Sequence, residues 1–343
     1  MRNRFVAYCL IWVAGLAFSC SNSRKQTPLQ EANRLFAKGD MPGAIALYDE
    51  VLTGNPVEKI ALVNRGQAKF AIADFPGAIA DFEEYIRLDE YNSDVFLLNG
   101  NAYFSAGADS IAEINYSRAI ENNTLNCKAW FNRAVIRKKR DALVLAMQDF
   151  TYAAQCDSSD AEALFRCAMC KKEINDNTGA LTDFTATIKR EPKHSGAYYQ
   201  RGLIFLYFNQ IDDAYSDFST AIDLKAKFPS PYVERGRILF SRDQYEDALK
   251  DFNMAVNLDS TLTTALMKRG AVKYLLGDFQ GALPDFNAVI EGNPQNANAF
   301  FYRANVKVKL GDPAGALPDY SAAGELGIMV AFDSIQRIQG RME

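Results

Sequence analysis

Histidine is nearly absent from this sequence, because His194 is the only one among 343 residues. Zinc sites built on histidine, and nucleophiles activated as Ser-His or Cys-His pairs, each need an imidazole. The phosphate-binding motif G-x-x-x-x-G-K, the nucleophile motif G-x-S-x-G and the zinc motif H-E-x-x-H are missing as well. The sequence therefore predicts a protein that is not an enzyme and that uses neither a cofactor nor a metal ion.

An excess of positive charge is also lacking. The chain has 38 Lys and Arg against 42 Asp and Glu, a net charge of -4, whereas a nucleic-acid partner would normally need a basic face. Only 21 Gly and 11 Pro occur, too few for a low-complexity chain, and 48% of the residues are hydrophobic. These values indicate a globular binding protein, for which we expect no nucleic acid and no small-molecule substrate.

Long apolar runs are confined to the N-terminus. Two arginines stand in the first four residues, residues 5–18 are apolar and uncharged, and residues 21–26 are polar. A basic start, a short apolar centre and small residues before a cut are typical of a secretory signal peptide. Fourteen residues at about 1.5 Å each span about 21 Å, short of the roughly 30 Å hydrocarbon core of a membrane. We therefore expect a signal peptide over residues 1–19.

The end of this segment, Ala17-Phe18-Ser19-Cys20, resembles the lipobox of bacterial lipoproteins, in which signal peptidase II cuts before a cysteine that is acylated. The box prefers leucine where this chain has Ala17. Ala17 and Ser19 would also suit an ordinary signal peptidase, which would leave Cys20 first but without lipid. The resemblance implies lipidation of Cys20, with residues 20–24 as the linker to the anchor.

A spacing of 34 residues runs through the rest of the chain. Alanine recurs at this spacing, a Gly or Ala precedes each alanine by twelve residues, and an aromatic residue follows each by four. The alanines are Ala44, Ala78, Ala112, Ala146, Ala180, Ala214, Ala248, Ala282 and Ala316. The aromatic residues are Tyr48, Phe82, Tyr116, Phe150, Phe184, Phe218, Phe252, Phe286 and Tyr320. So regular a spacing predicts one structural unit repeated along the chain.

These columns resemble the tetratricopeptide repeat, with its small residue at position 8, alanine at position 20 and aromatic residue at position 24. The resemblance implies two antiparallel helices per repeat, A and B, which cross closely at the small residues. Stacked repeats would form an all-α superhelix, a solenoid, with a concave groove lined by the A helices. We expect nine such repeats over residues 25–330 and a C-terminal capping helix over residues 331–343.

Two further columns vary together. Position 7 is arginine in six repeats, and position 23 of the same six is aspartate. We predict an Arg–Asp bridge between helices A and B in each of them: Arg65–Asp81, Arg133–Asp149, Arg201–Asp217, Arg235–Asp251, Arg269–Asp285 and Arg303–Asp319. The third repeat has Asn99 and Asn115 instead, and in the fifth repeat Cys167 would leave Asp183 without a partner.

Four cysteines follow Cys20, namely Cys127, Cys156, Cys167 and Cys170. Cys156 and Cys170 occupy repeat positions that are mostly apolar in the other repeats, which favours packing in the core. Two alternatives stay open: a disulfide from Cys156 to Cys167 or Cys170, which an exported protein would permit, and a zinc site of four thiolates.

Candidate ligand-binding residues come from the groove positions of helix A. Position 5 is apolar from the second repeat onward, so the lysine of a carboxylate clamp is missing. The run of residues 137–140 is basic, and Lys172 repeats Lys138 one repeat later, which suggests a basic patch for an acidic peptide. A solvated charge run at a helix C-terminus is the alternative interpretation. The predicted binding residues are Phe131, Lys138, Lys139, Phe165, Lys172, Tyr199, Tyr207 and Phe240.

The sequence thus predicts a non-enzymatic scaffold of the bacterial cell envelope that binds peptides or partner proteins in its groove. By resemblance, it would be an outer-membrane lipoprotein facing the periplasm, of a type that assists outer-membrane assembly, secretion or pilus secretin assembly, or organises cell-wall enzymes. A secreted chaperone-like carrier without lipid is one alternative. A redox or metal protein that uses the cysteines is the other.

Overall fold

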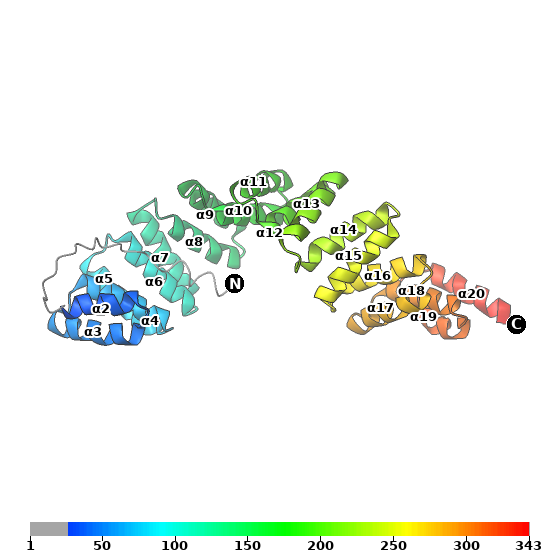
Figure 1. The fold of residues 1–343 in the computed structure, drawn as a ribbon, viewed down its shortest axis with the longest axis horizontal. Helices are drawn as coiled ribbons and strands as arrows, with labels where there is room; N and C mark the ends of the chain where they lie inside the picture. The colour runs from blue at the N-terminus through cyan, green and yellow to red at the C-terminus, as the bar shows by residue number, and fades with distance from the viewer. Residues whose placement is uncertain (1–26, 343) are drawn as a thin grey trace. The chain divides into compact units, whose positions relative to one another are not determined.

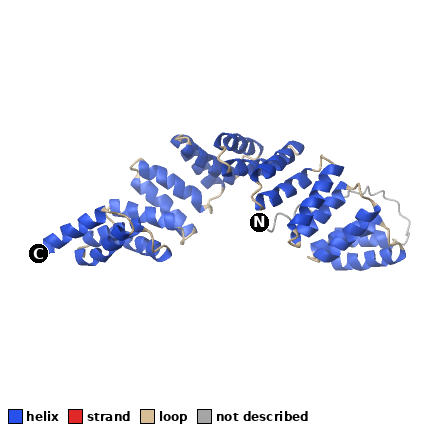
Figure 2. Cartoon of the chain, turned by 180° about the vertical axis from the view of Figure 1, so that it is seen from behind, coloured by secondary structure: helices blue, strands red, loops and turns tan. Residues whose placement is uncertain are grey.

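The structure, a computed structural model, describes residues 27–342, in which helices joined by short loops occur and no strand does (Figures 1 and 2). The predicted all-α fold is therefore confirmed. The chain divides into two compact units, residues 1–183 and 184–343. The predicted signal peptide, Cys20 and the linker after it lie outside the described residues.

Within each unit the helices follow one another in antiparallel pairs, and neighbouring pairs pack together as in a tetratricopeptide solenoid. The first unit contains α2 Pro28–Ala37, α3 Met41–Gly54, α4 Lys59–Ala71, α5 Phe75–Leu88, α6 Ser93–Ser105, α7 Asp109–Asn122, α8 Cys127–Lys139, α9 Leu143–Cys156 and α10 Ala161–Glu173. The unit boundary falls inside α11 Asn177–Arg190. The second unit contains α12 Ser195–Tyr207, α13 Ile211–Leu224, α14 Pro229–Ser241, α15 Tyr245–Leu258, α16 Thr263–Leu275, α17 Phe279–Gly292, α18 Ala297–Lys309, α19 Pro313–Glu325 and α20 Val330–Met342.

Local residue choice explains why each pair turns where it does. Helix α2 is followed by Gly39 with φ 83°, a left-handed conformation that glycine adopts without strain. Asp40 then caps α3, because its carboxylate accepts a hydrogen bond from the Gly43 N–H at 3.0 Å. The second repeat turns at Ala73 with φ 65°, so the left-handed residue is not always a Gly, Asn or Asp.

The small and aromatic columns form the core between the two helices of each pair. All nine alanines at position 20 are fully buried, and the aromatic residues at position 24 are at most 3% exposed. A Cβ added to Gly66 of α4 would lie 2.6 Å from the ring of Phe82 of α5. The helices therefore approach closely at position 8, and a large residue there would overpack the crossing.

The last helix closes this core at the C-terminal end. Helix α20 packs against α19, with Ala331 fully buried and Ile335 and Ile338 packed against the cluster around Tyr320. A terminal helix of this kind covers apolar surface that the last repeat would otherwise expose. It is the capping helix that the sequence predicts.

All six predicted Arg–Asp bridges are present, each within one repeat. At Arg133 of α8, Nε and Nη2 donate to the two carboxylate oxygens of Asp149 of α9, both at 2.9 Å. Such a two-point contact fixes the relative orientation of both side chains. The same geometry occurs at Arg65–Asp81, Arg201–Asp217, Arg235–Asp251, Arg269–Asp285 and Arg303–Asp319.

Each bridging arginine also reaches the preceding repeat. Nη1 of Arg133 donates to Ser117 Oγ of α7 at 3.0 Å. The side chains that accept from the other five arginines are Asp49, Thr185, Ser219, Asn253 and Asn287. All of them stand at position 25 of the preceding repeat, so one guanidinium joins three helices, a role that the sequence analysis missed.

The prediction that Asp183 is an orphan is wrong. Nζ of Lys171 on α10 lies 2.7 Å from Asp183 Oδ2, because position 11 is one helical turn beyond position 7 and faces the same aspartate. Position 11 adds a second cation to the aspartate in four other repeats, through Lys69, Arg137, Lys273 and Lys307. The fifth repeat therefore keeps the bridge with its cation moved by four residues.

Candidate functional site

The predicted binding residues of the first unit lie on α8 and α10, and its aromatic members are partly in the core. Phe131 is half-buried, and its ring packs edge-on against Phe150 of α9 with 5.3 Å between centroids. Phe165 is also half-buried. Most of the ring surface of Phe131 therefore serves packing within the repeat.

The lysines that follow are engaged with acidic side chains. Lys138 Nζ lies 2.7 Å from Glu173 of α10, and Lys139 donates a hydrogen bond to Asp109 of α7. Burial lowers the pKa of Lys172, which is half-buried. Because local acids already balance Lys138 and Lys139, the geometry favours a structural network over a free basic patch, and binding of an acidic peptide there stays a prediction.

The two arginines of the basic run belong to the same network. Arg137 donates to Glu113 of α7 at 3.0 Å and to Asp149 of α9 at 2.9 Å. Arg140 donates to the other carboxylate oxygen of Glu113 at 2.8 Å. These contacts tie the end of α8 to both neighbouring B helices, which is the function of a structural charge cluster.

Three of the predicted binding residues lie in the second unit: Tyr199 and Phe240 pack against other aromatic side chains, and Tyr207 is exposed. The ring of Tyr199 on α12 packs at a tilt against Phe218 and edge-on against Phe228, with centroids 6.0 and 5.0 Å away. Burial raises the pKa of the Tyr199 hydroxyl. Phe240 of α14 packs against Tyr245 at 5.5 Å. Tyr207, at the end of α12, is 71% exposed. Of these three side chains, Tyr207 is the one that a partner could reach without any repacking.

Exposed apolar side chains recur at the C-terminal ends of two A helices in this unit. Beside Tyr207, Phe208 is 40% exposed, and at the corresponding place after α16 Leu275 and Leu276 are 51% and 39% exposed. The rings of Tyr207 and Phe208 lie 5.3 Å apart. Large apolar residues left in water at equivalent positions of two repeats are typical of a binding surface.

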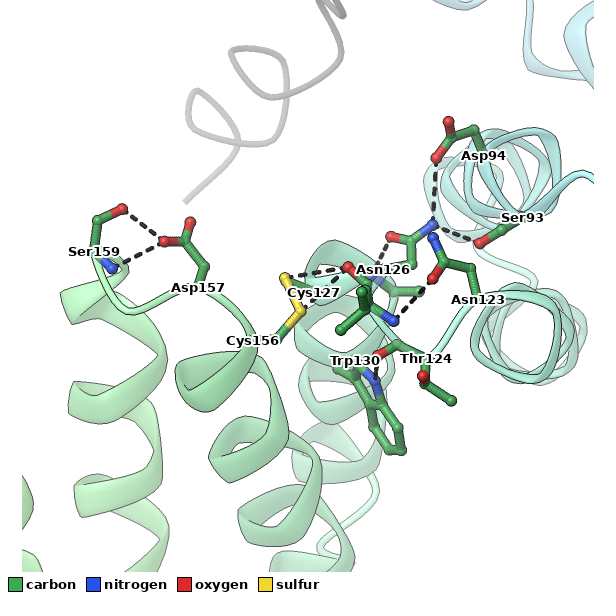
Figure 3. The surroundings of a disulfide bond; sticks show 12 residues. Ser93, Asp94, Asn123, Thr124, Asn126, Cys127, Trp130, Cys156, Asp157 and Ser159 are labelled. Atoms are coloured by element: carbon green, nitrogen blue, oxygen red, sulfur yellow. Dashed lines mark hydrogen bonds between the residues drawn. A yellow bond between two sulfur atoms is a disulfide. The ribbon is translucent and has the colours of Figure 1, made fainter.

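Cys156 pairs with neither of the two partners predicted for it from the sequence, Cys167 and Cys170. It forms a disulfide with Cys127, whose Cα lies 5.4 Å away (Figure 3). Cys127 begins α8 and Cys156 ends α9, so an antiparallel pair brings the two positions to the same end of one repeat. That relation between positions 1 and 30 was readable from the repeat register and was overlooked.

Cys167 and Cys170 are free thiols buried in the first unit. Burial raises the pKa of the Cys167 thiol to about 12, and the pKa of Cys170 is raised for the same reason. A thiol in that state forms little thiolate, the nucleophilic and metal-binding form. Over residues 27–342, no group of three or more His, Cys, Asp or Glu side chains is placed to hold a metal ion.

The helices of the described residues are 10 to 14 residues long. None of the described ones is long and apolar enough to cross a bilayer.

A family model for the tetratricopeptide repeat matches residues 29–93 and 268–326. A comparison with curated proteins finds no match. Among solved structures, the C-terminal part of a TPR repeat-containing protein from Cytophaga hutchinsonii superimposes with a TM-score of 0.61 at 16% identity, over 70% of this chain and 98% of that one.

Two more solved structures share the fold. PilF from Pseudomonas aeruginosa has a TM-score of 0.55 at 18% identity, over 63% of this chain and 98% of its own. A tetratricopeptide repeat protein from Parabacteroides merdae has a TM-score of 0.50 at 19% identity, over 72% of this chain and 99% of its own. At such identities the similarity concerns the fold alone. The chain therefore carries tetratricopeptide repeats and has the helix-pair solenoid fold that they build.

Proposed function

We propose that this protein is a non-enzymatic interaction scaffold of the bacterial cell envelope, which binds peptides or partner proteins on its A helices. The observation that carries the proposal is the exposure of large apolar side chains at the ends of α12 and α16, where Tyr207 and Leu275 are 71% and 51% exposed. Helical repeats present such surfaces to extended or helical segments of other proteins. Neither Cys167 nor Cys170 has the exposure that a catalytic thiol needs.

Two observations support a location in the envelope. The N-terminal segment has the features of an exported lipoprotein, with Cys20 at the expected cut. The Cys127–Cys156 disulfide is of the kind that persists in oxidising compartments such as the periplasm. The lipid on Cys20 would hold the repeats at the outer membrane, facing the periplasm.

The binding surface can be tested by affinity capture from envelope extracts with matched variants. We expect a partner that the natural chain retains to be lost with Tyr207→Glu/Leu275→Glu, because a carboxylate at each place removes apolar contact and must be desolvated on binding. The measured affinity of the identified partner should fall at least about tenfold, which corresponds to about 1.4 kcal/mol.

The matched control neutralises the basic run with Lys138→Gln/Lys139→Gln/Lys172→Gln. It should retain the same partner, because Lys138 and Lys139 are already engaged by Glu173 and Asp109. Loss with the lysine variant and retention with the tyrosine variant would move the site to α8 and α10 and contradict the proposal as stated.

The anchor is tested by the mass of the mature N-terminal peptide. We expect a peptide that begins at Cys20 and carries a lipid, and we expect Cys20→Ser to move the protein from the membrane fraction to the soluble fraction. A mature chain that begins at Cys20 without lipid and is soluble would replace the anchored scaffold with the secreted carrier.

A further inference from the structure

The third repeat lacks the Arg–Asp bridge and carries a pair of asparagines in its place. Asn99 Nδ2 of α6 donates to Asn115 Oδ1 of α7 at 3.0 Å, and Asn115 Nδ2 donates to the Ile111 carbonyl oxygen at 2.9 Å. A carbonyl oxygen can only accept, so the bond to Ile111 sets which way the Asn115 amide points. That in turn requires Asn99 to present its nitrogen to Asn115.

The side-chain oxygen of Asn99, Oδ1, consequently receives no hydrogen bond from Asn115. Asn99 is 2% exposed, and its Oδ1 is buried with no hydrogen-bond partner among residues 27–342. Buried polar atoms in folded proteins nearly always have a partner, and one that does not has an explanation such as a bound group. The Asn99 oxygen is an acceptor, so a group bound to it would be a donor.

Asn99 lines a pocket of about 370 Å³ whose lining residues belong to α5, α6 and α7. These three helices follow one another along the first unit (Figure 1). The polar lining of the pocket includes Glu83 of α5 and Tyr103 of α6. Phe96 and Ile111 contribute apolar surface. A flat group with several N–H donors and an apolar stem suits such a lining.

The other repeats show what normally occupies this place. In six of them a guanidinium from position 7 contacts position 23 of its own repeat and position 25 of the preceding one, as Arg133 does with Asp149 and Ser117. In the third repeat these two positions are Asn115 and Glu83, both of which offer acceptor oxygens. Asn99 supplies no guanidinium to them: its amide reaches Asn115, and Glu83 accepts from the Tyr103 hydroxyl instead.

The charges around the pocket favour a cation. Glu83 accepts a hydrogen bond from the Tyr103 hydroxyl, whose pKa is raised to about 12 by burial and then by this carboxylate, so the tyrosine stays neutral. Arg87, the one cation in the lining, is paired with Glu84. The sum over Glu83, Glu84 and Arg87 is one negative charge.

We propose that this pocket binds a guanidinium group from outside the chain, supplied by an arginine side chain of a partner protein or by free arginine. The group would donate to the exposed Glu83 carboxylate and, once the side chains that cover it have moved aside, to Asn99 Oδ1, close to the place that the chain's own arginine takes in six other repeats. The pocket uses positions 7, 23 and 25, so the inference is independent of the A-helix surface proposed above.

The test is a calorimetric or NMR titration of the full chain with three probes: N-acetyl-L-arginine amide, its neutral analogue N-acetyl-L-citrulline amide, and free L-arginine. We expect the arginine amide to bind with a Kd on the order of millimolar, at least about tenfold tighter than the citrulline amide. Tighter binding of the blocked arginine than of free arginine identifies a protein side chain as the ligand, and the reverse order identifies the free amino acid.

The matched variant is Asn99→Arg/Asn115→Asp, which recreates the sequence of the six bridged repeats and fills the pocket with the chain's own guanidinium. It should bind the arginine amide at least about tenfold more weakly while its unfolding temperature equals or exceeds that of the natural chain. Glu83→Gln should weaken binding severalfold without filling the pocket. Equal binding by the natural chain and the double variant, equal binding of the citrulline amide, or no binding of any probe would overturn the proposal.

Discussion

Asp149→Ala is expected to lower the free energy of unfolding by about 3–5 kcal/mol, because it leaves buried charges without their counter-ion. The Asp149 carboxylate accepts from Arg133 and from Arg137, each at 2.9 Å, and its side chain is 2% exposed. The two arginine side chains are only 12% and 18% exposed, so water cannot replace the lost partner well. Urea unfolding followed by circular dichroism measures the change as a lower midpoint.

The control for this variant is Asp212→Ala. Asp212 also contacts an arginine, Arg242, but its side chain is 95% exposed. An exposed ion pair contributes little, so the free energy of unfolding should change by at most about 0.5 kcal/mol. Equal midpoints for the two variants would show that burial of the bridge does not contribute to stability.

Loss of the disulfide is the second large effect. Cys127→Ser/Cys156→Ser should lower the free energy of unfolding by about 3–4 kcal/mol, because the bond closes a loop of about 30 residues in the unfolded chain. The loop is the entire helix pair of the fourth repeat, since the two cysteines are 29 residues apart in sequence. Urea unfolding under oxidising conditions compares the variant with the natural chain.

A reductant supplies the matched experiment. It should lower the unfolding midpoint of the natural chain to that of the double variant and leave the variant itself unchanged. Alkylation of the unreduced, denatured protein should label Cys167 and Cys170 and spare Cys127 and Cys156. Labelling of Cys127 and Cys156 before reduction would rule out the disulfide.

The six Arg–Asp bridges show how far comparison within one sequence can reach. Position 7 and position 23 change together in eight of the nine repeats, so their contact could be predicted without any structure. The contact from Arg133 to Ser117 could not, because position 25 holds Asp, Glu, Ser, Thr or Asn and shows no single residue type. Comparison between repeats therefore predicts a contact only where each of the two repeat positions keeps one residue type.

The basic run at the end of α8 shows the opposite case. In the sequence, Lys138 and Lys139 are surrounded by other cations and suggest a positive patch. In space, Lys138 meets Glu173 and Lys139 meets Asp109, which are 35 and 30 residues away. Charges from neighbouring helices therefore decide the local electrostatics, and sequence proximity misjudges them.

The helix pairs, their period, the buried Ala and aromatic columns and the six Arg–Asp bridges could all be predicted from the amino-acid sequence. These features recur every 34 residues and depend on packing within one repeat, where spacing along the chain specifies distance in space. The tertiary structure was needed to find the cation that pairs with Asp183 and the unused oxygen of Asn99. Each depends on how side chains that differ from repeat to repeat meet between helices, and a repeating pattern does not contain that information.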